Sequence, residues 1–236
     1  MLEFLKNKKI MVVVAHPDDE LLGLGATMNK LIQEYGVKTH LVILGEGITS
    51  RSDQRNPGEW KKELEIHKKN IHLAKDSIGY HNVSIHDFPD NRFDSVALLD
   101  IVKVIEKEKA AFSPDVIFTH HGGDLNIDHQ RTFEAVVTAI RPMENEKVST
   151  LIIFETPSGT EWRASTDPRH FVPNLFFEVS KKNIDAKIKG MEFYEFEKRK
   201  YPHPRSPEAL TIQAQRWGVA VGKPYAEAFH LVRMIS

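Results

Sequence analysis

Short apolar runs rich in valine and isoleucine alternate along this chain with longer stretches of helical periodicity, and this alternation constrains the fold most. The strand-like runs cover residues 9–15, 38–45, 114–120 and 149–155, with a weaker run at 82–88. The helix-like stretches cover residues 20–35, 58–78, 94–112 and 128–140. Short, continuous runs of β-branched residues are typical of strands that are buried on both faces, as in a parallel sheet. We therefore predict an α/β fold: a doubly wound three-layer sandwich in which a mostly parallel sheet carries helices on both faces.

The pattern changes after about residue 156, where a loop rich in proline and glycine begins. Beyond this loop the sequence predicts a strand, a charged helix, a turn, a second helix and a last strand, at 175–180, 181–200, 201–207, 208–221 and 229–235. A length of 236 residues suits one sizeable α/β domain. We expect a single domain over 1–236, with a core at 8–155 and a C-terminal extension at 156–236 that lies over the sheet edge.

The composition of the chain excludes several classes of function. The formal net charge is −1, so the overall charge favours neither nucleic acid nor an acidic membrane surface as a partner. The chain has no cysteine, which excludes disulfides, thiolate metal sites and cysteine nucleophiles. No apolar stretch has the length of a membrane span, and the N-terminus does not read as a signal peptide. We expect a cytoplasmic protein without a membrane span.

Polar residues collect directly after the predicted strands. The four segments concerned are HPDDE at 16–20, GEGITSR at 45–51, PDNR at 89–92 and HHGGDLNIDH at 120–129. In open parallel sheets, ligands bind outside the carboxyl ends of the strands. These four segments should therefore converge on one edge of the sheet and form a single site.

Three residues in these segments have the chemistry of a catalytic metal site. His16 and Asp19 are three positions apart at the start of a helix, so one helical turn can direct both at one point. His129 follows a neighbouring strand and is the best candidate for a third ligand. Three such ligands with an open position are typical of catalytic zinc. The alternative is that the acids only stabilise the first turn of the helix and that His129 is a capping or core residue.

Substrate-binding residues are less sharply marked. Asp90, Arg92 and Arg51 are on loops at the same edge and are candidates for binding sugar hydroxyls. A phosphate, as in a nucleotide sugar, would suit Arg51 or Arg205. Each arginine could instead be a surface residue or fix a loop through an ion pair. The long C-terminal loop holds Trp162 and Phe171, either of which could support a sugar ring or simply pack under the loop.

At these residues the sequence resembles the PIG-L (LmbE-like) family of zinc-dependent de-N-acetylases. The segments that carry the resemblance are AHPDDE at 15–20, GEG-TSR at 45–51, FPDNRF at 88–93, HHGGDLNIDH at 120–129, HPRSPEAL at 203–210 and AEAFHLVR at 226–233. Together they span nearly the whole chain. The resemblance implies a Rossmann-like fold and hydrolysis of the N-acetyl group of a glucosamine-type sugar.

Carried over by position, the resemblance implies one zinc ion per chain, bound by His16, Asp19 and His129, and Asp18 as the general base. Zinc lowers the pKa of bound water to about 7, and that water would attack the acetamide carbonyl. Some members of the family have a histidine three residues before the last ligand, where it stabilises the oxyanion. This chain has Asn126 there. The donor could be Asn126, or else His203, His120 or His121.

Several alternatives share this site. The substrate would be an acetylated amino sugar or its conjugate, but the same residues would also suit an amidase acting on another sugar-linked small molecule. A nucleotide- or sugar-binding module without catalysis is a third possibility. A phosphoesterase would favour two metals, and no convincing second ligand set stands out in the sequence. An exposed sheet edge or the C-terminal extension could mediate homo-oligomer assembly.

Overall fold

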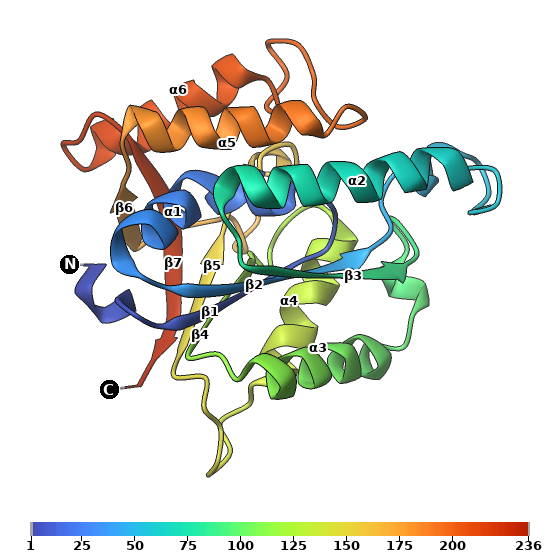
Figure 1. Cartoon of the computed structure of the whole chain (residues 1–236), viewed down its shortest axis with the longest axis horizontal. Coiled ribbons are helices and arrows are strands. Elements are labelled where there is room, and N and C mark those ends of the chain that lie inside the picture. The colour runs from blue at the N-terminus through green and yellow to red at the C-terminus, as the bar shows by residue number, and fades with distance from the viewer. Residues whose placement is uncertain (1, 236) are drawn as a thin grey trace.

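A seven-stranded sheet forms the centre of the molecule in the computed structural model, which describes residues 2–235 (Figure 1). The strand order is β3-β2-β1-β4-β5-β7-β6. The strands are β1 (Lys9–Val14), β2 (Lys38–Gly45), β3 (Asn82–Phe88), β4 (Val116–His120), β5 (Thr150–Phe154), β6 (Leu175–Glu178) and β7 (Ala226–Met234). The first five pair in parallel, whereas β7 is antiparallel to both β5 and β6. The prediction of a mostly parallel, Rossmann-like α/β fold is confirmed.

Helices cover both faces of the sheet. They are α1 (Asp19–Tyr35), α2 (Lys61–Ile78), α3 (Leu98–Phe112), α4 (Ile127–Ala139), α5 (Lys181–Phe193) and α6 (Pro207–Ala220). Helices α3 and α4 lie on one face, and the other four lie on the opposite face (Figure 1). The inner strands are apolar on both sides because each face packs against its own helical layer; for example, Val12 and Val14 belong to one core cluster and Met11 and Val13 to the other. None of the helices in residues 2–235 is long and apolar enough to cross a bilayer.

The C-terminal elements complete this sheet, and two of their predicted boundaries are wrong. The helix predicted for 181–200 ends at Phe193, because Tyr194 leaves the helix, buries its ring and donates its hydroxyl proton to Glu20 Oε1 at 2.7 Å. The strand predicted for 229–235 begins at Ala226. An acidic residue such as Glu227 is not expected in a buried strand. It is accommodated here because Lys187 Nζ donates a hydrogen bond to its carboxylate at 2.7 Å. The division of the chain into a core at 8–155 and a C-terminal extension at 156–236 stays a prediction.

Candidate metal centre and active site

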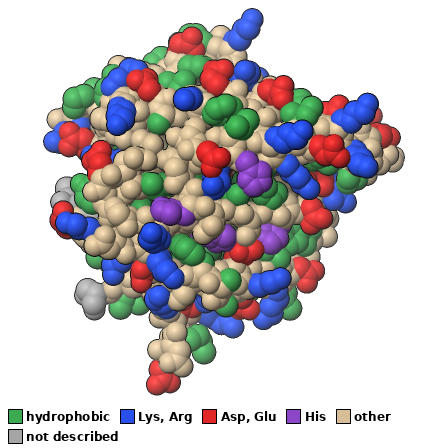
Figure 2. Space-filling view, in the orientation of Figure 1, with side chains coloured by type: hydrophobic (Ala, Val, Ile, Leu, Met, Phe, Trp, Pro, Cys, Tyr) green, Lys and Arg blue, Asp and Glu red, His purple; other side chains and the backbone are tan. Residues whose placement is uncertain are grey.

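A cavity of about 260 Å³ opens beyond the carboxyl ends of the parallel strands. Its walls come from the segments after β1, β2, β3, β4 and β5 and from the loop between α5 and α6. Histidine side chains gather with acidic and basic groups near the middle of the face shown in Figure 2. The convergence predicted from the sequence is therefore present, and the structure adds a wall from the C-terminal segment.

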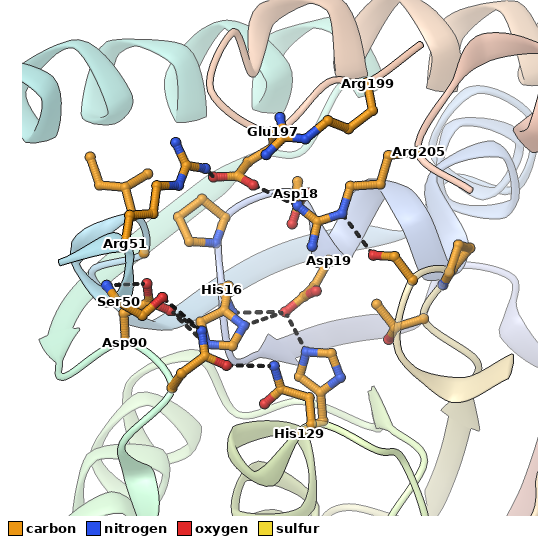
Figure 3. A pocket seen from close by; sticks show the side chains of 18 of the residues that line it. His16, Asp18, Asp19, Ser50, Arg51, Asp90, His129, Glu197, Arg199 and Arg205 are labelled. Carbon is orange, nitrogen blue, oxygen red and sulfur yellow. Dashed lines mark hydrogen bonds and ion pairs between the residues drawn. The ribbon is translucent and has the colours of Figure 1, made fainter. Parts of the chain in front are cut away.

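His16, Asp19 and His129 come together in this cavity (Figure 3). Asp19 Oδ2 lies 3.5 Å from His16 Nδ1 and 3.3 Å from His129 Nε2. One donor atom from each residue lies within 4.8 Å of the other two. Because these are two nitrogen donors and one oxygen donor in a largely buried pocket, the residues fit a divalent ion such as zinc.

Two further aspartates hold the histidine ligands. Asp128 Oδ2 lies 2.8 Å from His16 Nε2, and its other oxygen accepts a hydrogen bond from the backbone of Phe93. Asp124 Oδ1 lies 3.2 Å from His129 Nδ1. A carboxylate behind each imidazole leaves the opposite ring nitrogen free to bind a metal. Sequence reasoning missed both roles, although Asp128 directly precedes His129 and was part of the same motif.

The electrostatics of this cluster favour a cation. Burial alone would lower the pKa of His129, but the carboxylates of Asp19 and Asp124 outweigh that effect and raise it to about 9. Burial would raise the pKa of Asp19, yet the adjacent His129 contributes to holding it well below its ordinary value. Several carboxylates thus concentrate negative charge around the His129 ring.

Asp18 does not cap the helix that follows it. Its backbone has a left-handed conformation, with φ at 100°, and its side chain makes no capping hydrogen bond to α1. The residue is only 2% exposed, and Oδ2 has no hydrogen-bond partner among residues 2–235. Burial raises the pKa of this carboxyl well above its ordinary value, and the Arg205 guanidinium, with Nη1 3.2 Å from Oδ2, opposes that rise. The Asp18 side chain therefore points away from the helix backbone and is available to the cavity.

Glu20 supports the unusual backbone of Asp18. Its Oε2 accepts a hydrogen bond from the Asp18 backbone N–H at 3.1 Å, while Oε1 accepts one from Tyr194. Burial raises the pKa of Glu20 to about 7. The acids of the HPDDE segment thus face different surroundings: Asp18 and Asp19 line the cavity, and Glu20 is buried behind them.

The structure separates the candidate oxyanion donors. His120 is fully buried: its Nε2 accepts from the Ala15 backbone and its Nδ1 lies 2.9 Å from Thr156 Oγ1. His121 lies outside the cavity lining, with Nε2 2.7 Å from the Arg169 carbonyl oxygen. Neither histidine presents a donor to the cavity.

Asn126 and His203 both line the cavity but differ in their bonds. The Asn126 side chain caps α4 by accepting from the Asp128 backbone, and its Nδ2 donates to Asn91 Oδ1 at 2.9 Å. His203 Nδ1 accepts from the Arg205 backbone N–H at 3.1 Å, so its neutral ring carries a proton on Nε2. Burial, followed by the charge of Arg205, lowers the pKa of His203. His203 is thus the less constrained donor of the two.

Four residues were predicted to bind substrate, and three of them line the cavity: Arg51, Asp90 and Arg205. Asp90 is buried, and its Oδ2 accepts from the Ser50 backbone at 3.0 Å. Arg92 is exposed and lies outside the lining residues. Of the two aromatic candidates, Trp162 lines the cavity, whereas the Phe171 ring packs against His121 at a centroid distance of 5.3 Å.

Glu197 is a cavity residue that sequence reasoning missed. It is 8% exposed and accepts hydrogen bonds from Arg51 Nη2 at 2.6 Å and Arg205 Nη1 at 2.5 Å (Figure 3). The segment 194–206 appeared in the sequence as a charged helix followed by a turn, and no local pattern marked Glu197. Only the fold brings its carboxylate between two arginines from distant segments.

Comparisons with known proteins identify the family of this chain. A family model described as PIG-L, GlcNAc-PI de-N-acetylase, matches residues 11–140. The uncharacterized deacetylase YaiS of Escherichia coli (strain K12) is 26% identical over 192 residues, which cover 79% of this chain and 90% of YaiS.

Two solved structures show the same fold at low identity. The N,N′-diacetylchitobiose deacetylase of Pyrococcus horikoshii aligns with a TM-score of 0.72 and 18% identity, over 99% of this chain and 86% of that one. GalB, the 4-carboxy-2-hydroxymuconate hydratase of Pseudomonas putida KT2440, aligns with a TM-score of 0.71 and 19% identity, over 97% of this chain and 98% of that one. Since a deacetylase and a hydratase share this fold, the fold alone does not specify the reaction.

Proposed function

The chain belongs to the PIG-L family, and from this membership and the site geometry we propose that it removes the N-acetyl group from an N-acetylglucosamine-type sugar or conjugate. The observation that carries the proposal is the convergence of His16, Asp19 and His129 beside the buried carboxylate of Asp18. A binding module would have no need for a second, buried carboxylate next to a metal-ligand set.

We infer that one zinc ion would be held by His16, Asp19 and His129. When bound, zinc would polarise the acetamide carbonyl and acidify water. Asp128 and Asp124 would keep the two imidazoles oriented from behind. Other side chains in the cavity would transfer the protons and bind the sugar.

Asp18 would act as the general base. Its Oδ2 lies 3.2 Å from Nη1 of the cavity-lining Arg205, and its burial limits the access of bulk water to the carboxylate. The carboxyl would accept a proton from the attacking water and then hold it for the leaving amine.

His203 is the better candidate to stabilise the developing oxyanion or to protonate the amine, because its Nε2–H is not engaged by the protein in residues 2–235. Loss of such a donor typically lowers turnover by about 100- to 1,000-fold. Arg51, Asp90 and Arg205 would contact the sugar or its substituent, and Trp162 would lie against a ring.

The test is acetate release by zinc-loaded protein from N-acetylglucosamine, its short oligomers, simple glycosides and nucleotide-linked forms. We expect release from at least one, and a loss of about 100- to 10,000-fold in kcat for Asp18→Asn. Asparagine tolerates the left-handed backbone at this position, so the variant should fold. Zinc bound at one per chain should be unchanged in Asp18→Asn and lost in His129→Ala.

Two results would contradict the proposal. If no substrate releases acetate although zinc is bound, the reaction is a different one. If Asp18→Asn retains full activity, another group is the base.

A further inference from the structure

Helix α1 is broken shortly after its first turn. Leu24 has φ at −148° and ψ at 15°, which are not helical values, so the helix divides into a short first part that ends at Gly23 and a longer second part that begins at Gly25. A break of this kind leaves backbone carbonyls at the end of the first part and N–H groups at the start of the second without helical partners. The first part carries Asp19, and Asp18 directly precedes it.

A buried ion pair binds the backbone on both sides of this break. Glu227, on β7, accepts hydrogen bonds from the second part: its Oε1 from the Ala26 N–H at 3.4 Å and its Oε2 from the Thr27 N–H at 2.7 Å. Lys187, on α5, donates from Nζ to the Leu22 carbonyl of the first part at 2.9 Å. The same Nζ lies 2.7 Å from Glu227 Oε1. One ion pair therefore joins the two parts of the helix.

The charges of this pair suit the positions that they occupy. Ala26 and Thr27 are the second and third residues after Leu24, and N–H groups at these positions are the ones that an N-cap side chain usually binds. The Glu227 carboxylate lies at the positive end of the dipole of the second part, and the Lys187 ammonium lies at the negative end of the dipole of the first. Glu227 is 5% exposed and Lys187 is 4% exposed, so solvent screens these charges little. Apolar side chains could fill the same space, but they could not bind the backbone groups beside the break.

The orientation of the first part matters because Asp19 lies only one turn before Leu22. Asp19 Oδ2 is 3.3 Å from His129 Nε2, which belongs to α4, and 3.5 Å from His16 Nδ1. A functional site requires its groups to be held within about 0.5 Å of the productive geometry. A change in the angle between the two parts of α1 would move Asp19 relative to His129 and would distort the ligand set.

We propose that Glu227 and Lys187 are positioning residues for this ligand set: they fix the angle of the break in α1 and so hold Asp19 and Asp18 at the cavity. They would act through the helix backbone and would touch neither the metal nor the substrate. This role rests on the proposed function, because it requires that Asp19 binds the metal. It also accounts for part of the AEAFHLVR segment at 226–233, to which the proposed function gives no role.

The test uses Glu227→Gln and the double variant Lys187→Met/Glu227→Gln. In Glu227→Gln one carboxylate oxygen becomes an NH2 group, so either the Thr27 N–H or the Lys187 ammonium loses its acceptor. The double variant removes both charges and leaves no unpaired one. Ile105→Ala is a matched control, because Ile105 is fully buried on α3, in the core cluster on the other face of the sheet, and its truncation lowers stability away from the break.

Three quantities are compared: the midpoint of urea denaturation, the zinc affinity in competition with a chelator, and kcat and KM for acetate release by the zinc-saturated protein. We expect Glu227→Gln to lower the midpoint and to weaken zinc binding by about tenfold or more. The kcat should fall by about 10- to 100-fold with little change in KM, because the ligands and the base are displaced while the sugar contacts remain. Ile105→Ala should lower the midpoint but keep the zinc affinity within about twofold of the wild type.

The double variant separates positioning from stability. It should regain most of the lost midpoint because it buries no unpaired charge, whereas its zinc affinity should stay low because the backbone beside the break has lost its charged partners. If Glu227→Gln does not fold, the double variant carries the comparison with Ile105→Ala.

Zinc affinity that recovers together with the midpoint, or that Glu227→Gln leaves at the wild-type value, would overturn the positioning role. Acetate release by the same proteins would then leave the proposed function standing. Weakened zinc binding in the variants, together with a wild type that releases acetate from none of the substrates, would support the positioning role and reject the de-N-acetylase proposal.

Discussion

Asp128 shows how one buried residue sets the chemistry of another. Its carboxylate lies at His16 Nε2, and this contact favours the tautomer with the proton on Nε2 and a free lone pair on Nδ1, the nitrogen that faces Asp19. The same carboxylate anchors the Phe93 backbone. The orientation of His16 as a metal ligand therefore depends on Asp128, which is not itself one of the three proposed ligands.

Asp128→Asn should weaken zinc binding by about 10- to 100-fold. The amide can still accept from Phe93, but its Nδ2 presents a donor to His16 and favours the tautomer with the proton on Nδ1. Competition with a metal chelator measures the affinity, and Asp94→Asn, at an exposed acid, is the control. Unchanged zinc affinity in Asp128→Asn would show that the carboxylate does not orient the ligand.

His67 has an environment that should make stability depend on pH. It is 1% exposed, and neither ring nitrogen has a hydrogen-bond partner among residues 2–235. Burial lowers the pKa of His67 to about 4. The negative charges of Glu197 and Asp90 oppose this decrease, and the positive charges of Arg51 and His16 add to it. Because the unfolded chain binds a proton at higher pH, this residue disfavours folding as the pH falls.

The expected loss is about 3 kcal/mol in the free energy of unfolding between pH 7 and pH 4, most of it below the unfolded pKa of about 6.5. Denaturant titrations at several pH values measure it in the wild type and in His67→Leu. The variant should lose this part of the pH dependence. Parallel pH curves for the two proteins would refute the assignment to His67.

At the scale of elements, the approach of α1 to the sheet depends on a glycine. A Cβ at Gly23 would lie 2.1 Å from Cδ2 of the Phe154 ring on β5. Leu24 also departs from helical geometry, with φ at −148°, so the helix is kinked where it passes this contact. Gly23 thus lets α1 pack against β5 and bring Asp19 close to the strand ends.

Gly23→Ala should destabilise the protein by about 1–2 kcal/mol, because overpacking outweighs the roughly 0.5–1 kcal/mol that alanine contributes in a helix. Chemical denaturation measures the change. Gly58→Ala serves as a control, since the nearest atom to its added Cβ is Asn56 Oδ1 at 3.3 Å. A stabilised Gly23→Ala protein would mean that the Phe154 ring moves aside at little cost.

At the scale of the whole molecule, the C-terminal segment is joined to the rest through the sheet and through hydrogen bonds between a buried ion pair and the backbone of α1. Strand β7 lies between β5 and β6, and Lys187 on α5 binds both Glu227 on β7 and the Leu22 carbonyl on α1. Glu197, His203 and Arg205 come from the same segment. We therefore expect the chain to unfold as one unit.

Trp217, on α6, provides a test of this expectation. With Trp60 and Trp162 replaced by phenylalanine, its fluorescence reports on the C-terminal segment, while far-ultraviolet circular dichroism reports on the whole chain. The two denaturation midpoints should coincide. An earlier fluorescence transition would indicate that the segment after residue 156 unfolds separately.

Local sequence patterns were enough to predict the architecture and to group the candidate metal ligands. Apolar β-branched runs specify buried parallel strands, and the carboxyl ends of parallel strands necessarily share an edge, so His16, Asp19 and His129 could be grouped from their positions alone. The family resemblance then supplied roles for residues at those positions.

The residues that surround these ligands could not be predicted in the same way, because packing brings them there. Glu197 and Arg199 lie in a segment whose local pattern predicted a helix, but burial of Tyr194 ends the helix and turns the chain into the cavity. Asn126 and His203 were equivalent candidates until their hydrogen bonds distinguished a helix cap from a residue with a free donor. Strand and helix periods are local properties of the chain, whereas ion pairs between distant loops depend on how the packed layers bring those loops together.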